Sequence, residues 1–174
     1  SYFCFGLGYI VYVTFLAAWM REEGAGPGLV AAVWVSVGAG IAASPFLWRP
    51  VFARFASGLP LALVMAMLAV GALLPLAAAS RPALIASALL FGLALFMAPG
   101  AVTSFSRRNL PQALWGPAVS VFTLLFAIGQ TISPVAAGWI GDRAGGVAPA
   151  LLAGGLILLA GAAAALLQRP LRAA

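Results

Sequence analysis

The chain has 174 residues, of which 64% are hydrophobic and only 7% are charged. A soluble domain of this length cannot cover its surface with so few charged groups, so the mean hydropathy of +1.13 indicates a membrane protein. The chain has no His, no Lys and a single Cys, which excludes His-ligated haem, Cys/His zinc sites, disulfides within the chain, and catalysis by Ser–His, Cys–His or Ser–Lys pairs.

Six apolar stretches follow one another along the chain. Each is close to the roughly 20 residues that a helix needs to cross about 30 Å of hydrocarbon. The predicted spans are 2–20, 29–48, 59–79, 83–102, 117–140 and 147–167. Because helices satisfy their own backbone hydrogen bonds within lipid, we expect an all-α polytopic membrane helix bundle with six transmembrane helices.

Polar side chains are distributed unevenly among these spans. The third and sixth spans carry none, which predicts two three-helix repeats, each ending in a helix that faces lipid. The alternative is that Ala- and Leu-rich helices lack polar groups by chance. The polar residues are Tyr9, Tyr12 and Thr14 in the first helix, Trp34, Ser36 and Ser44 in the second, Ser87 and Thr103 in the fourth, and Ser120, Thr123, Gln130, Thr131 and Ser133 in the fifth.

The fifth span combines a polar stripe with a stripe of small residues. The small stripe should let a neighbouring helix approach closely, and the polar stripe should face a cavity or a partner helix. The polar stripe is Ser120, Thr123, Ala127, Gln130 and Pro134; the small stripe is Gly129, Ser133, Ala137 and Gly141; and the second span has a similar small stripe of Ala32, Ser36, Gly40 and Ser44.

Two prolines predict kinks in the fourth and fifth helices. Pro99 cannot donate to the carbonyl of Leu95, and Pro134 cannot donate to the carbonyl of Gln130. Gln130 therefore lies where a polar path could begin. The alternative is that its amide merely bonds to another helix.

The nine basic residues, all Arg, predict the orientation in the membrane. With six spans both termini lie on one side, which we expect to be cytoplasmic because it receives six arginines and no acid. These are Arg49, Arg54, Arg107, Arg108, Arg169 and Arg172, whereas Arg21, Arg81 and Arg143 on the other side are balanced by Glu22, Glu23 and Asp142. The basic side would meet anionic lipid, so no nucleic-acid partner is expected.

Several segments resemble the C-terminal six-helix half of a permease of the major facilitator superfamily. They are the Arg-rich loop FSRRNLPQALWG and the end of the fifth span, GWIGDRAGG, with its spacing of Pro134, Gly138, Asp142 and Gly145. The opening helix, FGLGYIVYVTFL, is similar to the seventh helix of a poorly characterised bacterial branch. Arg54 matches the Arg of the superfamily loop motif, although Arg49, Ala53 and Ala56 stand where Gly, Asp and Gly are expected.

The resemblance implies secondary transport of a small solute across the bacterial inner membrane by alternating access, with no enzyme activity and no cofactor. The first and fourth helices would line the cavity. The candidate substrate-binding residues are Phe5, Tyr9, Tyr12, Phe96, Thr103, Thr123 and Gln130, and the candidate gating or packing residues are Pro99, Pro134, Gly138, Asp142, Arg143 and Arg54.

The chain begins at Ser1 without an initiator Met, so we expect residues 1–174 to be one half of a permease whose N-terminal six-helix half is missing. The expected partners are therefore that half, the lipid bilayer and a small-molecule substrate. The alternative is a standalone six-helix scaffold, or an oligomeric membrane subunit without transport activity of its own, because small-residue stripes also serve dimerisation.

Overall fold

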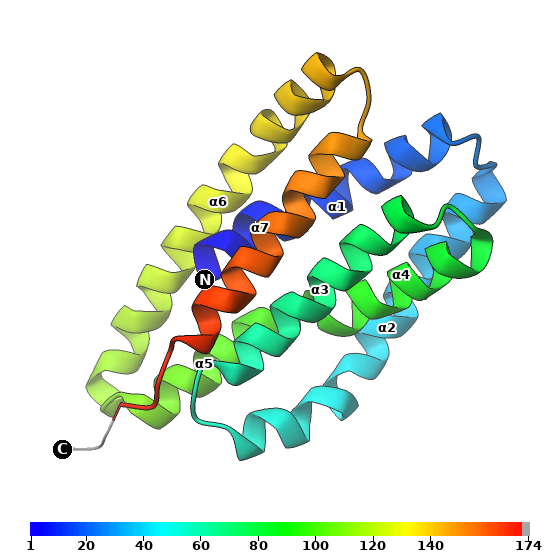
Figure 1. The fold of residues 1–174 in the computed structure, drawn as a ribbon. Helices are drawn as coiled ribbons and strands as arrows, with labels where there is room; N and C mark the ends of the chain where they lie inside the picture. The colour runs from blue at the N-terminus through cyan, green and yellow to red at the C-terminus, as the bar shows by residue number, and fades with distance from the viewer. Residues whose placement is uncertain (172–174) are drawn as a thin grey trace.

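In the computed structural model, which describes residues 1–171, the chain forms a bundle of helices (Figure 1). The elements are α1 (Tyr2–Glu22), α2 (Pro27–Arg54), α3 (Leu59–Ala77), α4 (Arg81–Leu95), α5 (Met97–Asn109), a short 3-10 turn η1 (Gln112–Leu114), α6 (Trp115–Ala144) and α7 (Ala148–Leu166). Six helical segments of the described chain are long and apolar enough to cross a membrane, with α4 and α5 together forming the fourth. The predicted all-α fold with six membrane-crossing helices is confirmed.

The fourth span is broken at Phe96, three residues before Pro99. Because Pro99 has no N–H, the helix loses the bond to the carbonyl four residues earlier, and the break occurs where the proline predicts one. Pro134, by contrast, lies inside α6, whose helix continues through it to Ala144. That helix ends at Gly145, which takes a left-handed conformation (φ 73°) suited to glycine.

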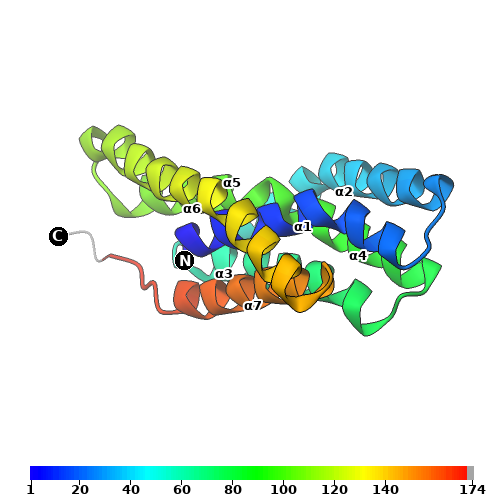
Figure 2. The same cartoon turned by 90° about the horizontal axis from the view of Figure 1, so that it is seen from above.

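The helices pack in matched pairs (Figures 1 and 2). Helix α1 packs against α6 and α7, helix α4 packs against α2 and α3, and α3 packs against α7. This places α3 and α7 together at the centre of the arrangement, with α2 and α6 at its two edges. The pairing is compatible with two three-helix repeats, and the repeat itself stays a prediction.

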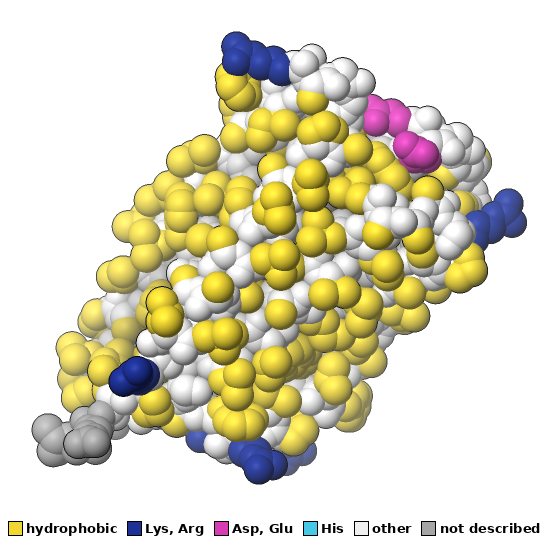
Figure 3. Space-filling view, viewed as in Figure 1, with side chains coloured by type: hydrophobic (Ala, Val, Ile, Leu, Met, Phe, Trp, Pro, Cys, Tyr) yellow, Lys and Arg dark blue, Asp and Glu magenta, His cyan; other side chains and the backbone are white. Residues whose placement is uncertain are grey.

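The two edge helices are far less buried than the others. In their most apolar stretches only 11% of α6 and 22% of α2 is buried, against 44–56% for the other four spans. Large apolar side chains such as Phe46 of α2 and Trp139 of α6 are exposed. Figure 3 shows the resulting apolar surface along the bundle, which a surrounding bilayer or another protein surface must cover.

Glycines allow the closest helix contacts. A Cβ atom on Gly129 of α6 would lie 2.8 Å from the Phe3 carbonyl oxygen of α1, and one on Gly40 of α2 would lie 2.7 Å from the Leu89 oxygen of α4. Real Cβ atoms essentially never come within 3.0 Å of a heavy atom from another part of the chain, so these two seams require glycine. The contacts replace the hydrophobic drive that lipid does not provide.

The predicted small-residue stripes are only partly correct. On α6, Gly129, Ser133 and Ala137 are buried, as expected. On α2, the buried face is Val33, Val37, Gly40, Ser44 and Trp48, whereas Ala32 is exposed and Ser36 half-buried. The prediction was wrong for Ala32 and Ser36, because α4 contacts the face of α2 that includes Val37, whose carbonyl oxygen would clash with a Cβ atom on Gly92. A stripe with steps of four residues turns about 40° further around the helix at each step, so it drifts away from that face.

Both termini of the described chain lie at the same end of the bundle, as an even number of spans requires. The side-chain amide of Gln168 donates to the Ser1 hydroxyl over 2.6 Å, and the Gly58 N–H donates to the Gln168 carbonyl over 2.9 Å. We call this the basic end. Its arginines are Arg49, Arg54, Arg107, Arg108 and Arg169, and Arg172 lies outside the described residues.

All three acidic residues lie at the opposite end, which we call the mixed-charge end. There the Glu22 carboxylate accepts a hydrogen bond of 3.1 Å from the Val147 N–H at the start of α7. Figure 3 shows acidic side chains gathered at one end of the visible face. The predicted separation of charge between two ends is therefore present in the described fold.

Candidate functional site

An aromatic cluster joins α1 to α6. Phe5 stacks on Tyr9 with ring centroids 4.8 Å apart, and Phe126 of α6 stacks on both rings, 5.5 Å from Phe5 and 5.7 Å from Tyr9. Tyr2 and Phe122 extend the cluster toward the basic end. The α1 members recur at intervals of three and four residues, so they share one helix face.

Tyr9 also provides the polar contact of this cluster. Its hydroxyl donates a hydrogen bond to Oε1 of Gln130, and both side chains are half-buried. Gln130 thus bonds to another helix, which was the alternative to its lying at the start of a polar path. Its amide nitrogen makes no hydrogen bond within residues 1–171, and none of their buried side-chain polar atoms lacks a partner. The amide nitrogen of Gln130 is therefore not fully buried, and its two N–H groups are free to donate.

Tyr12 lies inside the bundle. Its ring stacks on Phe91 at 3.9 Å, and its hydroxyl lies 2.8 Å from Oγ of Ser87, which donates its own proton to the Gly71 carbonyl over 2.6 Å. Since a serine has a single hydroxyl proton, Tyr12 is the donor to Ser87. This chain of bonds links α1, α4 and α3. Phe5 is buried as well. In this fold the side chains of Phe5 and Tyr12, both candidate binding residues, therefore pack against protein.

The remaining candidate binding residues lie outside the aromatic cluster. Phe96, at the break between α4 and α5, is 58% exposed. Thr103 is half-buried on α5, and Thr123 is exposed on α6. The Thr123 hydroxyl donates to the Val119 carbonyl of its own helix over 2.8 Å, which satisfies its polar group without a partner helix.

The candidate gating residues on α6 lie near the mixed-charge end. Gly138 and Asp142 line a pocket of about 290 Å³ that Glu22 of α1 also contacts. A Cβ atom on Gly138 would meet nothing within 4 Å. The Arg143 guanidinium lies over the Trp139 ring, 3.8 Å from its centroid, in a cation–π contact.

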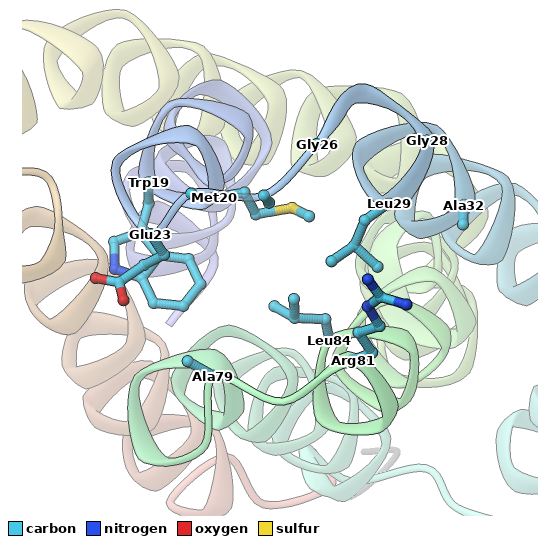
Figure 4. A pocket seen from close by; sticks show the side chains of 12 residues that line it. Trp19, Met20, Glu23, Gly26, Gly28, Leu29, Ala32, Ala79, Arg81 and Leu84 are labelled. Atoms are coloured by element: carbon cyan, nitrogen blue, oxygen red, sulfur yellow. The ribbon is translucent and has the colours of Figure 1, made fainter.

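A larger pocket of about 530 Å³ opens at the same end, between α1, α2 and α4. Figure 4 shows Glu23 and Arg81 on opposite sides of it, with Met20 and Leu84 between them. Met20, and Leu16 one turn deeper on α1, are fully buried. These side chains fill the space between the pocket and the Tyr12–Ser87 pair, so the bundle is packed shut beneath this pocket.

Sequence reasoning missed Phe126, Phe122 and the bonding partners of Tyr12. Phe126 lies four residues from Gln130, and Phe122 four residues further, so the helical spacing of the aromatic residues was a usable signal. No such signal connects Tyr12 with Ser87, which lies on a distant helix. Among residues 1–171 no group of three or more His, Cys, Asp or Glu side chains could hold a metal ion.

Comparison with known proteins places the chain in a family. The family model described as "Uncharacterised MFS-type transporter YbfB" matches residues 1–166. The chain belongs to this family. The predicted resemblance to a poorly characterised bacterial branch of the MFS is thereby confirmed, and the chain is a multi-pass membrane protein of an MFS-type transporter family. No curated protein and no solved structure matches it.

Proposed function

We propose that the chain is one half of an MFS-type secondary transporter that moves a small solute by alternating access. The observation that supports this proposal is the uneven burial of the spans. Only 11% of the most apolar stretch of α6 is buried, and only 22% of that of α2. In a bundle complete by itself, the helix with the most polar groups would be expected inside. An exposed, polar α6 beside α1 instead fits a surface that faces a second six-helix half and a shared cavity.

The binding site that we propose is centred on Tyr9 and Gln130. The accessible amide of Gln130 can donate to a solute, and the half-buried rings of Tyr9 and Phe126 can pack against its apolar part. We also assign Phe96, at the break between α4 and α5, and Thr103 of α5 to the wall of this cavity. Phe5 and Tyr12 act as positioning residues, because their rings and hydroxyl hold α1 against its neighbours. All of these side chains are uncharged, so they offer a solute neutral contacts.

We further propose that the basic end is cytoplasmic in the bacterial inner membrane. Its described arginines, Arg49, Arg54, Arg107, Arg108 and Arg169, have no acidic neighbour in the sequence segments around them. An excess of arginine in short loops is typical of the cytoplasmic side. The break at Phe96 and the proline in α6 are then the positions where the helices bend during exchange between the two open states.

Cysteine labelling in cells tests the cavity without knowledge of the substrate. Phe96 and Leu156 are almost equally exposed in the chain, at 58% and 52%, but we place Phe96 in the cavity and Leu156 of α7 against lipid. With Cys4→Ser as background, Phe96→Cys should react with a water-soluble thiol reagent, because only the thiolate in water is reactive. Leu156→Cys should not react.

The reagent should reach Phe96→Cys from both sides of the membrane as the transporter alternates. Protection of Phe96→Cys from both sides, with normal expression, would contradict a water-filled cavity on this face. It would then favour the scaffold alternative, in which the same apolar faces meet lipid or a second copy of the chain.

A further inference from the structure

An apolar groove lies on the surface between α2 and α3, both of which pack against α4. Its volume is about 440 Å³, and its walls include Leu47 and Val51 of α2, Leu63 and Val70 of α3, and Leu90 of α4. Leu47, Leu63 and Val70 are exposed although each is a large apolar side chain. None of the residues that line this groove belongs to the proposed solute site.

The floor of the groove is held in place. The Trp48 indole N–H donates to the Leu93 carbonyl over 2.7 Å, and the Trp48 ring stacks on Phe52 at 5.9 Å. Since this N–H is already bonded, the floor offers no free polar group to a ligand. A groove with such walls is suited to an alkyl chain, which it contacts by shape and dispersion.

The groove is too narrow to enclose a whole transmembrane helix, which could place only its side chains there. From Leu63 to Val70 the wall rises roughly 10 Å, at about 1.5 Å per residue. The volume of about 440 Å³ then corresponds to a width of roughly 6–7 Å, whereas a helix with its side chains is about 10–12 Å across. An acyl chain is narrow enough to lie in the groove.

An exposed cation, Arg54, continues the line of the groove at the basic end. Arg54 is the last residue of α2 and is exposed, and it follows Val51 by one helical turn and Leu47 by two. Its guanidinium lies 5.7 Å from the centroid of the Phe55 ring. The chain's three acidic residues, Glu22, Glu23 and Asp142, all belong to the mixed-charge end.

Arg108 of α5, which lies beside the end of α2, is by contrast already bonded. It donates to the Ala53 carbonyl over 2.6 Å, which caps the end of α2. Arg54 makes no hydrogen bond or ion pair of this kind among the described residues. Its guanidinium is thus free to meet an anion at the membrane surface.

We propose that this groove binds an anionic phospholipid, with one acyl chain between α2 and α3 and the phosphate against Arg54. An acyl chain gains no hydrophobic energy by leaving bulk lipid, so shape holds the chain in place and Arg54 supplies the selectivity for charge. The proposal requires only that the chain spans a membrane. It does not depend on a solute site at Gln130.

Native mass spectrometry of the protein with equal amounts of phosphatidylglycerol and phosphatidylcholine of matched acyl chains tests the proposal. The unaltered protein should retain phosphatidylglycerol preferentially. Arg54→Gln should reduce that preference about five-fold, the effect of one basic residue near an anionic headgroup. Arg54→Lys should keep most of it. Arg49→Gln is the matched control, since it removes the same charge from the same helix but away from the line of the groove.

Ala66→Phe tests the groove itself, because a half-buried wall residue of α3 would then fill the space for the acyl chain. It should abolish selective retention while Arg54 is still present. Equal losses in Arg54→Gln and Arg49→Gln would overturn the proposal, as would selective retention by a folded Ala66→Phe protein. If Ala66→Phe does not fold, the comparison of the two exposed arginines still decides the outcome.

Discussion

The seam between α1 and α6 should be intolerant of a single added methyl group. In Gly129→Ala the new Cβ atom would lie 2.8 Å from the Phe3 carbonyl oxygen and 3.1 Å from the Leu7 nitrogen, both backbone atoms. An ordinary contact begins at 3.4 Å, so the two helices must separate by about 0.6 Å. Because backbone atoms cannot rotate away as the end of a flexible side chain could, the helices themselves must move.

Gly138→Ala is the matched control on the same helix. A Cβ atom there would meet nothing within 4 Å. Both variants gain the helix propensity of Ala over Gly, about 1 kcal/mol, so that gain cancels in the comparison. The difference between them is the cost of overpacking, which is typically about 1–3 kcal/mol. We expect Gly129→Ala to be less stable than Gly138→Ala by that amount.

Unfolding of the purified protein in mixed micelles, driven by increasing sodium dodecyl sulfate and followed by tryptophan fluorescence, measures both free energies. The separation should also weaken the bonds across the seam, from Ser133 to the Leu7 carbonyl and from Tyr9 to Gln130. Equal stability of the two variants would refute the reasoning, because it would mean that α1 and α6 do not approach as closely as this fold requires.

Three further predictions follow from the same fold. Pro99→Ala should restore the missing backbone bond and join α4 to α5, which slower amide hydrogen exchange around residue 97 would report. Trp48→Phe should lower the free energy of unfolding by about 1 kcal/mol, because the hydrogen bond to the Leu93 carbonyl is lost. A cysteine introduced as Arg107→Cys should react with a membrane-impermeant reagent only from the cytoplasmic side, and Arg143→Cys only from outside.

Each of these has an outcome that would contradict it. Unchanged exchange in the Pro99 variant would assign the break at Phe96 to another cause. Trp139→Phe is the control for Trp48→Phe, since the Trp139 ring is exposed and a phenyl ring can keep the cation–π contact with Arg143. Equal losses of stability in the two variants would show that the Trp48 hydrogen bond does not stabilise the fold. Labelling of Arg107→Cys from outside would reverse the proposed orientation.

Part of the proposed site could be predicted from the residues alone. The sequence places Tyr9 and Gln130 as polar groups within spans, and a buried polar side chain in lipid needs a partner. It does not say which partner, because these two residues are 121 positions apart. Tyr12 illustrates the same limit, since its pairing with Ser87 depends on how α1 and α4 cross, and the pairing moves it from an expected cavity wall into the bundle.

The spans, the helical class and the separation of charge between two ends are properties that the sequence determines by itself. They follow from local rules: about 20 apolar residues cross the hydrocarbon, the backbone must bond within each helix, and arginines remain in the loops. None of these rules depends on which helix is next to which.

Only the tertiary structure decided which face of each helix is inside. In water the apolar face of a helix marks the core, but in a bilayer lipid-facing and core-facing positions are both apolar, so that pattern disappears. This is why the buried face of α2 includes Val33 and Val37 where the small stripe predicted Ala32 and Ser36. Close backbone contacts at Gly40 and Gly129 set those faces, and such contacts exist only once the helices have met.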